Sequence, residues 1–197
     1  MRRGGGQRLL LAAALLTPVL PYTGRAASLN LAAVNCAKYE NEVLSATTPG
    51  MALDPIDTVM WLFGFSVARS GQRYMYGDSL TAFGFALDGE CKNAPTSSLL
   101  QAVSGLRSKR DNPMDLTRLN CTTFETRHAA LHQSDPQSAT TLVMWLFGYA
   151  VGLSGGHVLD SDALGTFESS LQAECTRRPT ASLYEVLNAP NPAVPTH

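Results

Sequence analysis

The chain has 197 residues, of which 45% are hydrophobic and 16% charged, and its formal net charge is −1. This composition excludes a long disordered or fibrous chain, because low hydrophobicity and high net charge are what prevent a chain from burying a core. The balanced charge also argues against a nucleic-acid partner, which needs a basic face on the protein. No run of about 18 apolar residues follows residue 28, so we expect no membrane span in the mature chain.

Residues 1–27 have the order of a secretory signal peptide. Three arginines precede an apolar stretch over 9–20, and the segment ends in small residues: Gly24, Ala26 and Ala27. A stretch of about 12 apolar residues is short for a span, which needs about 20, so an uncleaved membrane anchor is the weaker reading. We therefore predict cleavage close to Ala26. The mature chain keeps 11 basic residues against 16 acidic ones, a net charge of −5.

The rest of the chain contains one unit written twice. Residues 60–71 recur as residues 144–155, with eight of the twelve positions identical, and the same offset of 84 relates ten further positions downstream. Cys36 matches Cys121 once one residue of slippage is allowed. We predict a first unit over 28–106, a linker over 107–115, a second unit over 116–190 and a Pro-rich tail over 191–197.

Each unit is expected to be helical, which predicts an all-α fold of two tandem small domains, each with about four helices and one disulfide. In chain order, each unit is predicted to begin with an opening helix, over 36–46 and 121–132, followed by a central helix, over 57–70 and 141–154. Strand signals follow at 73–76 and 157–159. A second helix then starts at 78–79 and 161–162, and a third at Pro95 and Pro179. The central helices are apolar all round, which is typical of a buried helix.

Small residues four apart mark one face of each central helix. Gly64 precedes Ala68 in the first unit, and Gly148 precedes Gly152 in the second. In membranes this spacing marks helix dimers. These runs are too short to span a bilayer, so we expect them to allow tight helix packing in a soluble core.

Four cysteines allow three disulfide pairings, and the repeat selects one of them. Cys36–Cys91 and Cys121–Cys175 close loops of 55 and 54 residues, one within each unit. A loop of that size stabilises the folded chain by about 4 kcal/mol on the chain-entropy model. No Cys-x-x-Cys pair is present, so neither a redox site nor a zinc site is indicated.

Candidates for catalysis or metal binding are weak. His128 and His132 stand four residues apart on a predicted helix and could hold a metal, but exposed helix residues are the simpler interpretation. His157 takes the place of Arg73 in the repeat. With no Gly-rich phosphate loop, no Gly-x-Ser-x-Gly motif and no paired carboxylates in fixed repeat geometry, we predict no catalytic residue, no metal and no cofactor.

The motifs together resemble the HdeA/HdeB family. The resemblance rests on Cys-x-x-Tyr/Phe at Cys36 and Cys121, Met-Trp-Leu-x-Gly-Phe/Tyr in each central helix, and Glu-Cys-x-x-x-Pro-Thr-x-Ser-Leu at Cys91 and Cys175. It covers about 36–104 and 121–188. The family consists of small all-helical periplasmic proteins that look like acid-stress chaperones, folded as homodimers near neutrality and loosened by acid to hold unfolding proteins.

The resemblance implies a periplasmic holdase in which the two units form a pseudo-dimer within one chain. Its partners would be unfolded or acid-denatured periplasmic proteins. The client-binding residues implied are those of the central helices, concealed until acid loosens the fold: Trp61, Leu62, Phe63, Phe65, Trp145, Leu146, Phe147 and Tyr149.

Two features of the sequence differ from the acid chaperones. The mature chain has only three lysines, and the covalent link between the units opposes dissociation. The alternative is a periplasmic binding or immunity-type module that recognises one folded partner at neutral pH. A small-molecule enzyme is the third and weakest hypothesis.

Overall fold

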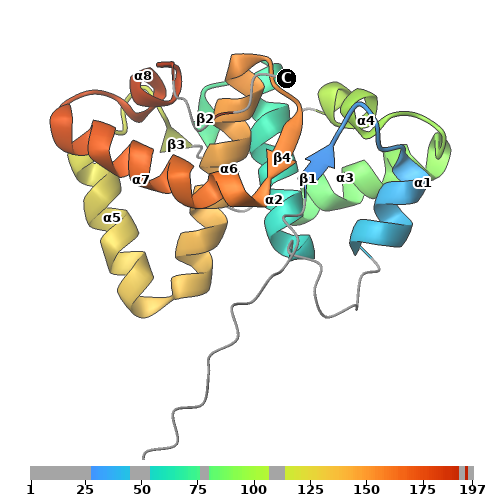
Figure 1. Ribbon diagram of the computed structural model, residues 1–197, viewed down its shortest axis with the longest axis horizontal. Coiled ribbons are helices and arrows are strands. Elements are labelled where there is room, and N and C mark those ends of the chain that lie inside the picture. Colours follow the sequence, from blue (N-terminus) through green and yellow to red (C-terminus); the bar gives the residue numbers. More distant parts are fainter. Residues whose placement is uncertain (1–27, 45–53, 76–79, 107–113, 191–193, 195–197) are drawn as a thin grey trace, which may run out of the picture.

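The computed structural model describes residues 28–44, 54–75, 80–106, 114–190 and 194. The predicted signal peptide and residues 107–113 of the predicted linker lie outside the described residues. Helices dominate the described residues, and the two units repeat the same order of elements. The predicted all-α, two-unit fold is confirmed (Figure 1).

The elements of the first unit are β1 (Ser28–Asn30), α1 (Cys36–Lys38) with a π-helical continuation over Tyr39–Leu44, α2 (Pro55–Arg69), β2 (Tyr74–Met75), α3 (Leu80–Asn93) and α4 (Leu99–Gly105). Those of the second unit are β3 (Met114–Asp115), which lies within the end of the predicted linker, α5 (Cys121–Ser134), α6 (Pro136–Ser154), β4 (Val158–Asp160), α7 (Ser161–Arg177) and α8 (Leu183–Leu187). The remaining helices of each unit flank α2 and α6 on opposite sides of the molecule (Figure 1).

Short polar side chains set the helix starts. Asp54 accepts a hydrogen bond from the Ile56 amide at the start of α2, and Asp135 accepts one from the Ser138 amide at the start of α6. These contacts satisfy amides that have no partner inside the helix. Helix α7 is likewise capped by Asp160, one residue before the predicted pair.

The predicted starts of the third helices at Pro95 and Pro179 are wrong. Helix α4 begins at Leu99 and α8 at Leu183, where Ser98 and Ser182 cap the first turn. The two prolines instead offer their carbonyls to the opening helices, Pro95 to the Ala37 amide at 3.0 Å. A serine side chain supplies the acceptor that a first turn needs, which proline does not.

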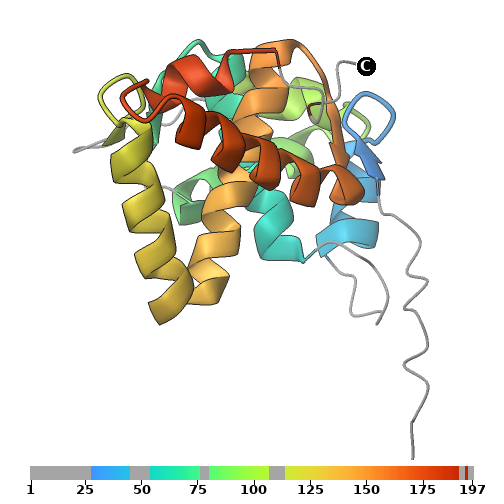
Figure 2. The ribbon, with the colours of Figure 1, turned by 60° about the vertical axis from the view of Figure 1, so that its left-hand side comes forward.

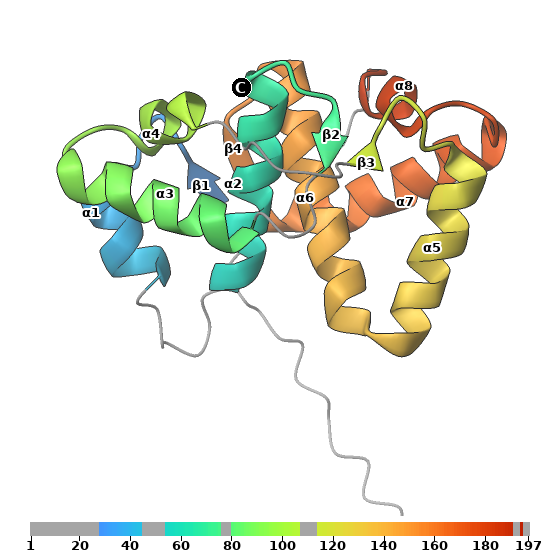
Figure 3. The same ribbon diagram turned by 180° about the vertical axis from the view of Figure 1, so that it is seen from behind.

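The two units exchange strands. β1 of the first unit pairs antiparallel with β4 of the second, and β3 of the second pairs antiparallel with β2 of the first (Figure 3). Of these, β2 and β4 were predicted from the sequence, whereas β1 and β3 were not. Two equivalent backbone bonds, Leu31 N to His157 O at 3.0 Å and Leu116 N to Arg73 O at 2.9 Å, extend both pairings. Each of the two-stranded sheets therefore takes one strand from each unit.

Both disulfides form within a unit, as the repeat predicts. Cys36 is bonded to Cys91 and Cys121 to Cys175, and all four residues are buried. Each bond joins the first turn of an opening helix to the later part of a second helix. The bond therefore fixes the opening helix of each unit to the second helix, which it also contacts.

The seam, defined here as the contact surface between α2 and α6, is the most extensive contact between any two elements of the described chain. Gly64 faces the Trp145 carbonyl and Gly148 faces the Trp61 carbonyl, and in both cases a Cβ would overlap that oxygen. A Cβ on Gly152 would similarly lie 2.8 Å from the Ala68 methyl. The small-residue pattern therefore joins the two units, and Figure 2 shows the two helices running through the centre of the molecule.

We expect Gly64→Ala and Gly148→Ala each to lower the free energy of unfolding by about 1–3 kcal/mol or more, because the backbones must separate to admit a methyl group. Gly165→Ala on α7 is the matched control. Its Cβ would meet nothing within 4 Å, so the better helix propensity of alanine should leave stability unchanged or raised by up to about 1 kcal/mol. Urea unfolding followed by circular dichroism measures all three; equal midpoints for G64A and G165A would contradict the close approach.

Candidate functional site

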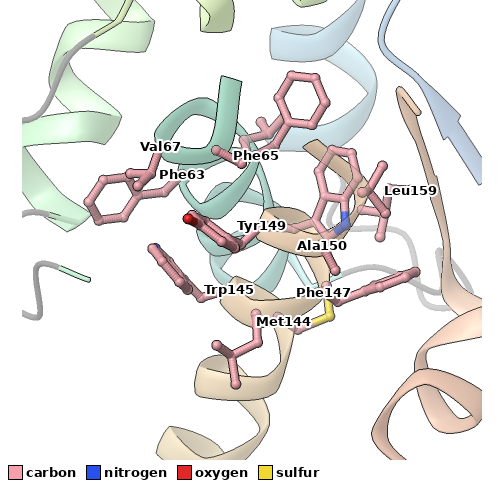
Figure 4. Packing of buried hydrophobic residues seen from close by; sticks show 14 of the residues in the cluster. Phe63, Phe65, Val67, Met144, Trp145, Phe147, Tyr149, Ala150 and Leu159 are labelled. Atoms are coloured by element: carbon pink, nitrogen blue, oxygen red, sulfur yellow. The ribbon is translucent and has the colours of Figure 1, made fainter. Parts of the chain in front are cut away.

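The side chains predicted to bind clients are all concealed in the folded chain. The following have no exposed surface: Trp61, Leu62, Phe63, Phe65, Trp145, Leu146, Phe147 and Tyr149. All eight belong to one core cluster, and Figure 4 shows Phe63, Phe65, Trp145, Phe147 and Tyr149 on the two helices of the seam. In this state none of them can contact a partner, so any binding through them requires the fold to open.

Aromatic rings fill the seam in a nearly symmetrical way. Trp61 stacks on Phe65 with ring centroids 5.5 Å apart, and Trp145 stacks on Tyr149 at 5.2 Å. Each central helix also packs a phenylalanine against its own second helix, and Phe63 meets Trp145 edge to face at 6.3 Å. Such ring pairs add about 0.5–1.5 kcal/mol each to their area burial.

Some polar groups inside this aromatic core have hydrogen-bond partners and others have none among the described residues. The Tyr149 hydroxyl donates to the Gln72 carbonyl at 2.9 Å, and the buried Ser66 hydroxyl lies 2.9 Å from the Val103 carbonyl. The indole Nε1 groups of Trp61 and Trp145, by contrast, have no hydrogen-bond partner among the described residues. A buried donor without a partner costs about 1–3 kcal/mol. Opening the seam would return both indoles to water and recover that cost.

One half-buried carboxyl lies at the end of the seam. Asp57 on α2 accepts a hydrogen bond from the Thr141 hydroxyl of α6 at 3.3 Å. Burial, and then the neighbouring charge of Asp54, raise the pKa of the Asp57 carboxyl above its usual value, while the Thr141 hydrogen bond acts in the opposite direction. Compared with the unfolded chain, the folded chain therefore holds a proton on Asp57 more strongly.

The pKa values of three other carboxyls are lowered in the folded chain, and all three residues lie at position 115 or beyond. Hydrogen bonds from Thr117 lower the pKa of Asp115, and hydrogen bonds from Ser138 lower that of Asp135. The Arg177 guanidinium, assisted by Arg178, holds the pKa of Glu174 below its usual range. The folded chain favours the ionised form of these three groups.

The histidine pair lies on the flank of the second unit. His128 stacks on Phe124 with centroids 5.7 Å apart, and its Nε2 lies 3.9 Å from a carboxylate oxygen of Glu168 on α7. His132 meets His128 edge to face at 6.4 Å. Within the described parts of the chain, no group of three or more His, Cys, Asp and Glu side chains is arranged to hold a metal ion.

Exposed apolar side chains occur on the first unit at positions that were not among the predicted client-binding residues. Phe85 on α3 is 72% exposed and Ile56 on α2 is 57% exposed. The repeat offered a signal for Phe85, since the equivalent position on α7 is Ser169. Across the residues that the structure describes, no helix is long and apolar enough to cross a membrane.

Comparison with known proteins relates the second unit to one family. Residues 102–185 match the model of the HdeA/HdeB family, a stretch that begins in α4 and reaches into α8. No curated protein and no solved structure matches the chain. The first unit, apart from its last residues, lies outside this match.

Truncating either tryptophan should strongly destabilise the fold. We expect Trp61→Ala and Trp145→Ala each to lower the free energy of unfolding by about 3–5 kcal/mol, the usual range for a large buried aromatic. Phe85→Ala is the control, an exposed aromatic whose loss should change stability by no more than about 0.5 kcal/mol. Thermal and urea unfolding measure the set, and tryptophan variants as stable as F85A would contradict the buried seam.

Removing the charge of Asp57 should raise stability at neutral pH. Because the folded-state pKa of Asp57 is raised, its ionised form opposes folding above that pKa and has no such effect in acid. We expect Asp57→Asn to raise the melting temperature at pH 7 and to leave it unchanged at pH 3. Asp135→Asn should lower the melting temperature at pH 7, because the lowered folded-state pKa of Asp135 means that its ionised form stabilises the folded chain. Melting curves of both variants at the two pH values decide this, and a D57N variant less stable than wild type at pH 7 would contradict it.

Proposed function

We propose that the chain is an exported, periplasmic holdase chaperone that acid activates, built from two tandem HdeA/HdeB-like units. The observation that carries the proposal is the match of residues 102–185 to the HdeA/HdeB family, whose members are periplasmic acid-stress chaperones. The signal-like segment over 1–27 supports export. The internal repeat supports the assignment of the first unit to the same family.

The buried aromatic seam supports a holdase, because a holdase needs apolar surface that is concealed until it is required. The eight predicted client-binding residues of α2 and α6 have no exposed surface in the folded chain. Few large apolar side chains among the described residues are exposed. Burial of this surface keeps the protein soluble at neutral pH. Its exposure would provide a non-directional binding surface, which suits clients that share no sequence.

The direction in which the pKa values of several carboxyls are shifted supports acid as the trigger. Asp115, Asp135 and Glu174 have lowered folded-state pKa values, so the stability they contribute is present above the ordinary carboxyl range and is lost as the pH falls through those lower values. Below about pH 3 most of the 16 carboxyls are neutral, and the mature chain, with 11 basic residues and four histidines, becomes strongly positive. Self-repulsion then weakens the compact state.

The two disulfides support a reversible response. Each holds an opening helix to a second helix within its own unit, independently of pH. A chain loosened by acid would therefore stay compact, with its secondary structure close to native. Neutralisation would restore the carboxylate contacts and allow the seam to close again.

The decisive test follows light scattering of an acid-denaturing client with and without the mature protein. We expect aggregation to be suppressed at pH 2, little effect at pH 7, and suppression to coincide with increased binding of an apolar dye while the far-ultraviolet helical signal is retained. An unrelated acid-stable protein at equal mass is the control. Increased dye binding without suppression would reject the holdase, and tight binding of one folded protein at pH 7 would favour an immunity-type module.

A further inference from the structure

A groove lies between α5 and α7 of the second unit, apart from the seam. It has a volume of about 410 Å³, which lies within the range of small-ligand pockets, about 300–1,000 Å³. Its apolar lining consists of the buried side chains of Phe124, Val143 and Leu171. In Figure 2, α5 and α6 form a hairpin that extends below the body of the molecule, and α7 runs across α6. We call this hollow the α5–α7 groove.

The polar lining of the groove offers negative charge and hydrogen-bond acceptors. Glu125 on α5 and Glu168 on α7 each carry one negative charge in the formal count at pH 7, which treats histidine as neutral. The Nε2 atom of His128 lies 3.9 Å from a carboxylate oxygen of Glu168, which is too far for a hydrogen bond. None of the described residues that line the groove is a lysine or an arginine. The groove therefore combines two carboxylates and an apolar surface with no permanent positive charge.

One oxygen of Glu125 shows that this shortage of positive charge is unfavourable. The Oε1 atom of Glu125 has almost no surface exposed to water, and it has no hydrogen-bond partner in the described chain. A buried polar atom without a partner destabilises a fold, and the effect is larger when the group is charged. A positively charged group in the groove would offset the charge of this carboxylate.

The first unit supplies such a group from its own chain. Lys92 in the first unit and Thr176 in the second each follow the second cysteine of their disulfide by one residue. Glu40 and Glu125 each follow the first cysteine by four residues. The hydrogen bond and charge of Asp88, and then the charge of Glu40, raise the pKa of the Lys92 ammonium. In the second unit Thr176 takes the place of that lysine and lines the groove.

We propose that the α5–α7 groove binds a small organic amine at neutral pH, with its ammonium against the carboxylate of Glu125 and its apolar body against Phe124 and Leu171. The ligand takes the part that the side chain of Lys92 has in the first unit. A bound amine stabilises the second unit, because it binds the folded chain and not the unfolded one. This site is open in the folded protein and does not depend on the holdase function.

Calorimetric titration of the mature protein with benzylamine at pH 7 tests the proposal. Benzyl alcohol and benzoate are the control ligands, since they keep the ring and replace the ammonium with a neutral hydroxyl and a negative carboxylate. We expect benzylamine to bind about tenfold more tightly than benzyl alcohol, because hydrogen bonds to charged groups are stronger than neutral ones, and we expect no binding of benzoate. Amide chemical shifts should change in α5 and α7 and stay unchanged in α1 and α3. Equal affinities for benzylamine and benzyl alcohol would overturn the proposal, as would the absence of benzylamine binding.

Two matched pairs of variants locate the ammonium. Glu125→Gln removes the charge that lines the groove, and Glu40→Gln removes the equivalent charge of the first unit. We expect only E125Q to weaken benzylamine binding, by about tenfold, as expected when the charged partner of an ammonium is lost.

Thr176→Lys gives the second unit the lysine that the first unit has, and its ammonium should take the place of the ligand and abolish benzylamine binding. Thr126→Lys is the control, because Thr126 is an exposed residue of α5 that does not line the groove. A T176K variant that binds benzylamine like T126K would overturn the proposal even if E125Q does not fold. All of these measurements use the folded chain without a client, so their failure leaves the holdase assignment unchanged.

Discussion

The close approach of α2 and α6 at Gly64 and Gly148 is the constraint on which the rest of the structure depends. Each glycine lies against the backbone carbonyl of a tryptophan on the other helix, so neither position can carry a side chain. The middle of each helix is buried on all sides, over 61–68 in α2 and 143–152 in α6, and the aromatic rings of both lie in these stretches. A unit separated from its partner would expose these rings, so neither unit has a complete core of its own.

Covalent linkage lets equivalent positions in the two units diverge into complementary pairs. In a symmetrical homodimer the same residue meets itself at the two-fold axis. Here Asp57 accepts a hydrogen bond from Thr141, which is its equivalent in the repeat, and Ala68 packs against its equivalent, Gly152. Tyr149 reaches the Gln72 carbonyl, whereas its equivalent Phe65 has no hydroxyl to donate. The contact between the two units is therefore not symmetrical at these positions.

The sequence predicted what depends on local pattern and repetition. The disulfide pairs, the buried central helices and the tight packing at Gly64 and Gly148 all follow from spacing within one unit or from comparison of the two. The pairing of strands between the units could not be predicted in this way. Strands β1 and β3 are two to three residues long, and each pairs with a strand of the other unit more than 35 residues away. The third helix starts were misplaced because proline suits a first turn, yet the acceptor at Ser98 and Ser182 decides where the turn begins.

The site was predictable only in part, because composition and spacing do not show which surfaces are closed or how charge is distributed around them. The seam carries one carboxyl, Asp57, whose protonation favours the folded chain, whereas Asp115, Asp135 and Glu174 favour it only when ionised. Acidification therefore relieves a charge at the seam and removes charges that hold the second unit. The glycine contacts and buried rings of the seam carry no charge, so acid acts on them through the carboxyls of neighbouring residues.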